Sequence, residues 1–86
     1  MITLVYAPGF IRKFKKLDTG LQDEIIEKLG LFKNEANHEK LKVHKLKGVL
    51  KNCHSFSVNY KFRVVFSYGS KNDVHILSVG NHEIYE

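Results

Sequence analysis

Cysteine is almost absent from this chain of 86 residues, in which Cys53 is the only one. A single thiol cannot form an internal disulfide or build a metal site from several thiolates. Long apolar runs are lacking too: residues 2–6 are apolar, but they are too short for a signal peptide or a membrane span and follow no basic leader. Repeats, low-complexity tracts and linkers are also missing. These absences favour one soluble domain, residues 1–86, with the cytoplasm as its expected compartment and no membrane partner.

Acidic residues are in the minority, since 9 Asp and Glu stand against 14 Lys and Arg and give a formal net charge of +5. A basic surface favours an anionic partner, such as nucleic acid, an acidic protein segment or an anionic membrane. A charge of this size also serves solubility alone. Hydrophobic residues make up 43% of the chain, which is enough for a packed globule rather than a disordered chain.

The first half of the sequence predicts one strand and two helices. Residues 2–6 are β-branched and aromatic, as is typical of a strand, and a Pro-Gly pair directly afterwards ends it. Apolar residues at helical spacing then predict a short amphipathic helix over residues 10–17, with a basic back. A longer helix is predicted over residues 21–32, with Asp18 or Thr19 as its N-cap.

The second half predicts a loop and then only strands. Residues 34–39 are polar and without periodicity, so they are expected to form the loop that leaves the second helix. Strand-like segments follow over residues 41–44, 53–58, 62–68 and 74–79. The order β-α-α-β-β-β-β predicts an α+β fold, with two N-terminal helices packed on one face of a mainly antiparallel sheet of four to five strands.

Side chains that carry chemistry gather in the last third of the chain. From residue 53 onwards there are three histidines, one arginine and three tyrosines. Imidazoles transfer protons near neutral pH, a guanidinium is a fixed cation, and phenol rings stack on bases. Such groups are what a protein needs to hold and cut a nucleic acid.

Three motifs in this sequence occur in an order that resembles a known family. They are VHKLKG at residues 43–48, RVVF at residues 63–66 and VGNHEIY at residues 79–85. Together with chain length and the order of helices and strands, they resemble the RelE/ParE superfamily of type II toxin–antitoxin toxins. The resemblance is strongest to the RelE- and YafQ-like ribosome-dependent mRNA endonucleases, and it covers nearly the whole chain.

The resemblance implies a toxin that enters the ribosomal A site, cleaves mRNA there and is neutralised by a cognate antitoxin in a hetero-oligomer. Cleavage of this type uses the neighbouring 2′-hydroxyl as nucleophile, so no metal or other cofactor is expected. It needs a base for the 2′-hydroxyl, a cation for the phosphate and an acid for the leaving oxygen. The same fold also serves ParE-like inhibitors of DNA gyrase, and a catalytically degenerate antitoxin-binding protein is a third alternative.

The strongest catalytic candidates are His82 and Arg63. His82 follows Gly-Asn at a strand end and lies where YafQ-like toxins carry a catalytic histidine, so it is expected to act as acid or base. Arg63 lies in an apolar strand, where a charge is costly unless it is paired or faces the open side of the sheet. By resemblance it matches the strand arginine that holds the scissile phosphate. A structural ion pair with Glu83 or Glu86 is the alternative.

The resemblance also implies roles for His54, His44 and Tyr85. His54 faces the core if its strand buries the even-numbered positions, and it faces His82 if the register shifts by one residue. His44 matches the histidine before the Leu-x-Gly turn. Tyr85 is expected to stack on a base or donate a proton, although the family's aromatic residue usually follows the histidine by four positions rather than three. Each of these three side chains has a purely structural alternative.

Other positions depart from the family pattern. Asn59 stands where YafQ-like members carry an aspartate, and an amide cannot act as a base. Ser55 and Ser57 stand where RelE-like members carry lysines, so the pattern is incomplete and closer to the histidine type. His38 and His75 are expected to be structural or surface residues. The residues predicted to contact RNA without reading its sequence are Lys45, Lys47, Lys51, Lys61 and Tyr60.

Overall fold

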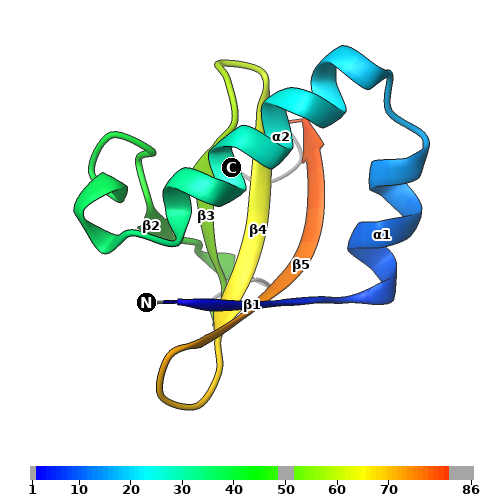
Figure 1. Ribbon diagram of the computed structural model, residues 1–86. Helices are drawn as coiled ribbons and strands as arrows, with labels where there is room; N and C mark the ends of the chain where they lie inside the picture. The colour runs from blue at the N-terminus through cyan, green and yellow to red at the C-terminus, as the bar shows by residue number, and fades with distance from the viewer. Residues whose placement is uncertain (1, 49–51, 82–86) are drawn as a thin grey trace.

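The computed structural model describes residues 2–48 and 52–81, and within these ranges the strands form one five-stranded sheet of order β1-β5-β4-β3-β2 (Figure 1). The strands are β1 (Thr3–Tyr6), β2 (His44–Lys45), β3 (His54–Ser57), β4 (Phe62–Tyr68) and β5 (Asp73–Asn81). β1 pairs with β5 in parallel, and the other neighbours pair in antiparallel fashion. The predicted α+β fold with a mainly antiparallel sheet is therefore confirmed.

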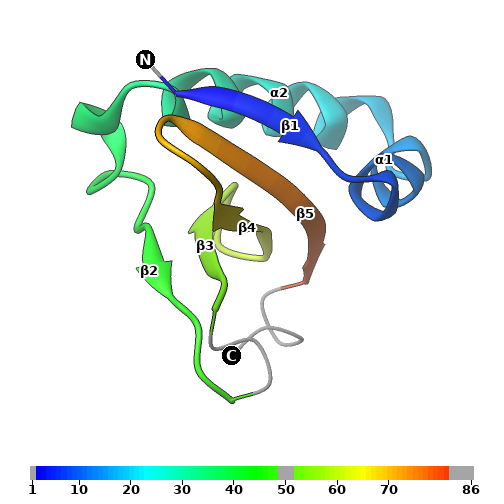
Figure 2. The same ribbon diagram turned by 90° about the horizontal axis from the view of Figure 1, so that it is seen from below.

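Two α-helices in the described ranges, α1 (Pro8–Lys15) and α2 (Thr19–Phe32), cover one face of the sheet (Figure 2). Pro8 suits the first turn of α1, because the N–H it lacks has no intrahelical partner there. Asp18 is the N-cap of α2, since its Oδ1 accepts a hydrogen bond from the backbone N of Leu21 at 2.8 Å. None of the helices in the described part of the chain is long and apolar enough to cross a bilayer.

The hydrophobic core lies between α2 and the middle of the sheet. Phe32, at the end of α2, stacks on Phe56 of β3 and tilts against Phe66 of β4, with centroid separations of 4.8 Å in both cases. All three rings are fully buried, as is Ile25 on the same helix. Full burial of such a side chain stabilises the fold by about 1.5–3 kcal/mol, so these contacts fix which face of the sheet the helices occupy.

The strand register divides the remaining side chains between the two faces. Directly opposed residues of an antiparallel pair lie on the same face, and Phe56 opposes Val64 on the side that packs against α2. Arg63 opposes Ser57, one residue out of phase with that core pair. Arg63, Ser57 and Ser55 therefore lie on the other face, which no described helix covers and which we call the helix-free face.

Two local features differ from the sequence prediction. The strand predicted over residues 41–44 is shifted, and β2 covers His44–Lys45. Lys42 has a φ of 58°, a left-handed conformation that interrupts extended backbone, so the strand begins only after it. The predicted loop over residues 34–39 contains a short 3₁₀ helix, η1 (Glu35–Asn37), which is capped by the side chain of Asn34.

Candidate functional site

Arg63 and Ser57 form one half of a polar cluster on the helix-free face. They are register partners on β4 and β3, and Arg63 Nη1 donates a hydrogen bond to Ser57 Oγ at 2.5 Å. Arg63 is half-buried and has no carboxylate partner among the described residues, where the one ion pair joins Lys28 to Glu27. A guanidinium carries five N–H donors, so Arg63 can bind an anion while it holds Ser57.

His44 and Ser55 form the other half. His44 opposes Ser55 in the register of β2 and β3, and its ring is exposed. His44 Nδ1 lies 2.9 Å from the backbone oxygen of Lys42, which can only accept a hydrogen bond, so Nδ1 carries the proton. When the ring is neutral, Nε2 therefore keeps its lone pair, and it lies 3.5 Å from Ser55 Oγ. This tautomer makes His44 a proton acceptor on the helix-free face.

The two halves of the polar cluster (His44, Ser55, Ser57 and Arg63) are close because the two serines alternate along one strand. Residues two apart on a strand point to the same face and lie roughly 6.6 Å apart. The cluster therefore places a fixed cation and an imidazole on the same face, with two hydroxyl groups between them. Its serines stand where the family pattern has lysines, so the anion-binding charge in this cluster comes from the arginine.

His54 lies on the opposite face of β3 from this cluster. Its ring stacks on Phe66 at 5.6 Å and meets the edge of Tyr68 at 4.9 Å. The core-facing alternative is thus the observed register for His54. Its Nδ1 is buried and has no hydrogen-bond partner within the described structure. This burial, and then the nearby charges of Lys45 and His44, lower the pKa of His54 below its usual value of 6.5.

The remaining predicted site residues fall into two groups. His82, Tyr85 and Lys51 lie outside the described residues. The side chains of the others, Lys45, Lys47, Tyr60 and Lys61, are exposed. Lys61 Nζ lies 6.0 Å from the ring centre of Phe62, and Tyr60 is 92% exposed in the hairpin between β3 and β4.

Asn59 holds this hairpin in place with three hydrogen bonds. Its Oδ1 accepts from the backbone N of Lys61 and of Phe62, both at 2.8 Å, which closes the turn. Its Nδ2 donates to Glu24 Oε1 on α2 at 2.8 Å. An aspartate here would set a carboxylate against Glu24, so the departure from the YafQ-like pattern has a structural reason.

A groove with a volume of about 470 Å³ lies beside Arg63, between α2, residues 40–42 and the β3–β4 hairpin. Its charged lining residues are all cations, and we call it the cationic groove: Lys28, Lys40, Lys42 and Arg63. The three lysines were not among the predicted site residues, because they come from two segments far from Arg63 in the chain. The density of lysines at residues 40–47 was the available signal.

The comparisons with known proteins find similarity in structure alone. No family model matches the chain, and no curated protein matches its sequence. Among solved structures, the conserved hypothetical protein HP0894 from Helicobacter pylori superposes with a TM-score of 0.73 at 22% identity, covering 96% of this chain and 97% of that one. The YoeB–YefM toxin–antitoxin complex from Staphylococcus aureus has a TM-score of 0.72 at 23% identity, with 95% and 98% covered.

The toxin–antitoxin complex RelBE2 from Mycobacterium tuberculosis has a TM-score of 0.72 at 18% identity, with 94% and 98% covered. The chain has the RelE/ParE fold. The predicted resemblance is confirmed at the level of the fold, since each superposition covers at least 94% of this chain and at least 97% of the other chain. Identities below 25% establish the fold, and the function has to be argued from the residues.

Within this RelE/ParE fold, an apolar hollow of about 250 Å³ lies over α1, α2 and β1. It is lined only by apolar and aromatic side chains: Tyr6, Phe10, Ile11, Phe14, Ile26 and Leu29. Ile26 is 57% exposed and Ile11 is 40% exposed, which is high for isoleucine. Its exposed isoleucines make this hollow a candidate interaction surface.

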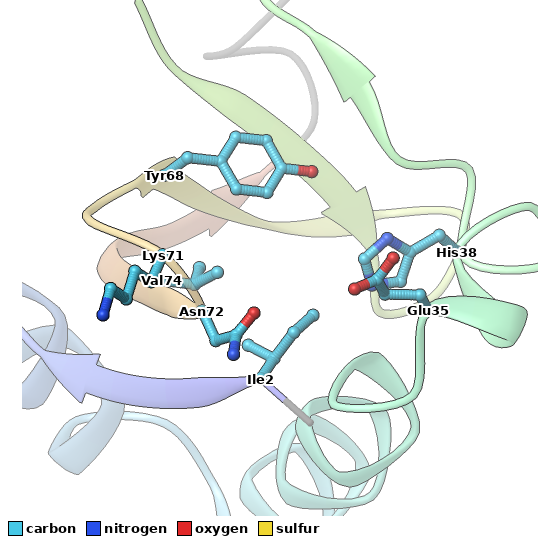
Figure 3. Close-up of a pocket in the computed structure, with 7 residues that line it drawn as sticks. All are labelled: Ile2, Glu35, His38, Tyr68, Lys71, Asn72 and Val74. Atoms are coloured by element: carbon cyan, nitrogen blue, oxygen red, sulfur yellow. The ribbon is translucent and has the colours of Figure 1, made fainter.

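Figure 3 shows a smaller hollow of about 120 Å³, where Glu35, His38, Tyr68 and Lys71 are among the lining residues. His38 is already engaged there, because its Nε2 lies 2.8 Å from the backbone oxygen of Phe32 and its ring stacks on that phenyl ring at 4.5 Å. His38 thus binds the C-terminal end of α2, which agrees with the structural role expected for it. Across the described side chains, no group of three or more His, Cys, Asp or Glu is placed to hold a metal ion.

Proposed function

We propose that the chain is the toxin of a type II toxin–antitoxin system and that it cleaves mRNA on the ribosome. The observation that carries this proposal is the polar cluster, in which Arg63 and a proton-accepting His44 occupy the helix-free face of a RelE/ParE fold. The YoeB–YefM and RelBE2 structures, which share the fold, are toxin–antitoxin complexes and support the toxin assignment.

In the proposed reaction, the 2′-hydroxyl oxygen attacks the adjacent phosphorus while the bond to the 5′-oxygen breaks. Arg63 binds the non-bridging oxygens and stabilises the charge that develops on them. His44 Nε2 takes the proton of the 2′-hydroxyl, because Nδ1 is already protonated against Lys42. The 5′-oxygen leaves with a proton from an acid, for which His82 is the predicted donor and Tyr85 a predicted stacking or proton-donating neighbour. The products are a 2′,3′-cyclic phosphate and a 5′-hydroxyl.

His54 has a different part in this proposal. It lies on the core-facing side of β3, the strand that also carries Ser55 and Ser57, and its ring stacks on Phe66 of β4. Direct contact with a phosphate bound by Arg63 does not follow from that position. We assign it the role of a positioning residue that holds β3 against β4 through this ring contact.

The cognate antitoxin is the proposed occupant of the apolar hollow. Arg12 and Lys15 lie on α1 beside the apolar residues of the hollow and carry no acidic partner in the described structure. An amphipathic antitoxin segment with acidic flanks would complement both the apolar surface and these charges. Such a toxin–antitoxin complex would form in the cytoplasm. The free toxin would instead bind the ribosome and its mRNA.

Controlled expression in bacterial cells tests the proposal. Wild-type chain should arrest growth with mRNA cut inside ribosome-bound codons, and co-expression of the antitoxin should relieve the arrest. Arg63→Ala should abolish toxicity while the purified variant keeps its fold. Arrest accompanied by DNA damage and gyrase poisoning would overturn the RNase assignment in favour of a gyrase inhibitor. Absence of any growth defect would favour a degenerate antitoxin-binding protein.

A further inference from the structure

We propose that the cationic groove holds the single-stranded RNA on one side of the cut, with phosphates on Lys40 and Lys42 and one base stacked on Tyr60. The proposal rests on the proposed function, because it extends the path of the same RNA beyond Arg63. Three observations carry it: the charge of the groove, the exposure of Tyr60 and the physical link between the groove and the polar cluster.

The positive charge of the groove is only partly neutralised, because Glu27 pairs with Lys28 but Lys40, Lys42 and Arg63 have no acidic partner in the described structure. No acidic residue lines it. Glu27 lies 3.6 Å from Lys28, and Glu24 accepts the hydrogen bond from Asn59. Lys40 and Lys42 are exposed and line the groove together with Arg63. Clustered cations along a groove are the electrostatic footprint expected for a phosphate backbone.

Tyr60 supplies a flat surface at the edge of the same groove. At 92% exposure it contributes little to the packing of this protein. Asn59 accepts two backbone hydrogen bonds across the turn, so the hairpin presents the phenol ring on a fixed support. Bases of any sequence stack on such rings. An acidic peptide would use the lysines but has no regular flat face for Tyr60, so the pair of features favours RNA.

The groove and the polar cluster share atoms and residues. Arg63 and Ser57 belong to both, and a hydrogen bond joins these two side chains. Lys42 accepts the hydrogen bond of His44 Nδ1 on its backbone oxygen and donates its own N–H to Glu39. These bonds hold Lys42 at its φ of 58°, which is uncommon for a lysine. Because Arg63 lines the groove as well, an RNA strand bound at Arg63 can continue directly into the groove.

The test measures binding rather than cleavage. A fluorescent 10-nucleotide single-stranded RNA with 2′-O-methyl groups cannot be cut through its 2′-oxygen, and its affinity is measured by anisotropy over a series of salt concentrations. The variants are Lys42→Asn and Tyr60→Ala. Lys71→Asn is the matched control, because Lys71 is also an exposed lysine with positive φ, at 49°, but lines the hollow of Figure 3 instead. Asparagine tolerates that backbone conformation at both positions.

Tyr60→Ala is expected to weaken binding by about 5-fold to 100-fold, the loss typical for one stacked base, and Tyr60→Phe should restore it. Lys42→Asn should reduce the slope of log affinity against log salt by about 0.7, the value for one phosphate contact, while Lys71→Asn leaves it unchanged. Equal affinities for wild type, Lys42→Asn and Tyr60→Ala would overturn the inference, as would a wild-type chain that does not bind the RNA at low salt.

Two further outcomes distinguish an RNA-binding groove from a protein-binding groove and from a failure of the proposed mRNA cleavage. If the groove variants keep full RNA affinity but lose affinity for the antitoxin, the groove belongs to a protein partner and the inference is wrong. If the variants lose RNA affinity as expected but wild type never cleaves mRNA on ribosomes, the groove stands as an RNA site and the proposed function fails. The uncleavable RNA keeps the two results independent.

Discussion

Replacement of Asn59 by aspartate is a change of a few atoms that should destabilise this protein markedly. Asn59 donates to Glu24 through Nδ2 and accepts from the backbone of Lys61 and Phe62 through Oδ1. Asn59→Asp keeps the two accepted bonds, loses the donated one and sets two carboxylates against each other. Asn59→Ala loses all three bonds.

The expected losses in free energy of unfolding follow from the type of each hydrogen bond. A hydrogen bond to a charged group contributes about 1.5–3 kcal/mol, and a bond between neutral groups about 1 kcal/mol. Asn59→Asp should therefore cost about 2 kcal/mol in free energy of unfolding. Asn59→Ala should cost about 3.5 kcal/mol, at the low end of the sum because Asn59 is only half-buried and water can replace part of each bond. For a domain of this size, about 1 kcal/mol shifts Tm by about 4–8 °C, so both losses are well above experimental error.

Urea unfolding at neutral pH measures both variants, and a double-mutant cycle with Glu24→Gln isolates the contact. Glu24→Gln supplies an amide donor for the new carboxylate, so the double variant Asn59→Asp with Glu24→Gln should recover most of the stability lost by Asn59→Asp alone. The coupling energy should be about 2 kcal/mol. An Asn59→Asp variant as stable as wild type, or no recovery in the double variant, would show that Asn59 does not tie the hairpin to α2 as described.

Two further predictions concern His54 and the apolar hollow. The folded-state pKa of His54 lies below its usual 6.5, so the unfolded chain takes up the proton first, and the free energy of unfolding should fall as pH drops from above 6.5 through the folded pKa. His54→Phe should remove this part of the pH dependence between pH 7.5 and 5, and parallel stability curves for both proteins would refute the assignment. Ile26→Glu should leave toxicity intact but prevent neutralisation by the antitoxin, because it puts a charge into the apolar hollow. Gly30→Glu, which adds the same charge to open space on the same helix, should still be neutralised, and equal neutralisation of both variants would place the antitoxin elsewhere.

Local sequence signals sufficed for much of the fold. The helical periodicity before residue 33, the cap at Asp18 and the apolar run at residues 63–66 each depend on neighbours in the chain, and each is found as predicted. The position of β2 was not predictable in the same way. It depends on the left-handed conformation of Lys42, whose backbone bonds to His44 and Glu39, and no apolar pattern in the sequence marks such a conformation.

The site was predictable only in part for a similar reason. The position of Arg63 on the helix-free face follows from strand alternation once Val64 is known to be buried. The tautomer of His44 depends on the oxygen of Lys42, and no pattern in the sequence reports it. The cationic groove joins lysines of α2 and of residues 40–42 to a hairpin much further along the chain. Such a site is created by packing, so it becomes visible only in three dimensions.

The chemistry of the cut tests the central claim most directly. Wild-type protein added to ribosomes that carry an mRNA should produce fragments with a 5′-hydroxyl and a 2′,3′-cyclic phosphate, and a single 2′-deoxy substitution at the scissile nucleotide should abolish the cut. Arg63→Ala should reduce the cleavage rate by about 100-fold to 1,000-fold, the usual effect of removing one group that stabilises a developing charge. Fragments with 5′-phosphates, cleavage of the 2′-deoxy mRNA or an undiminished rate in Arg63→Ala would contradict the account.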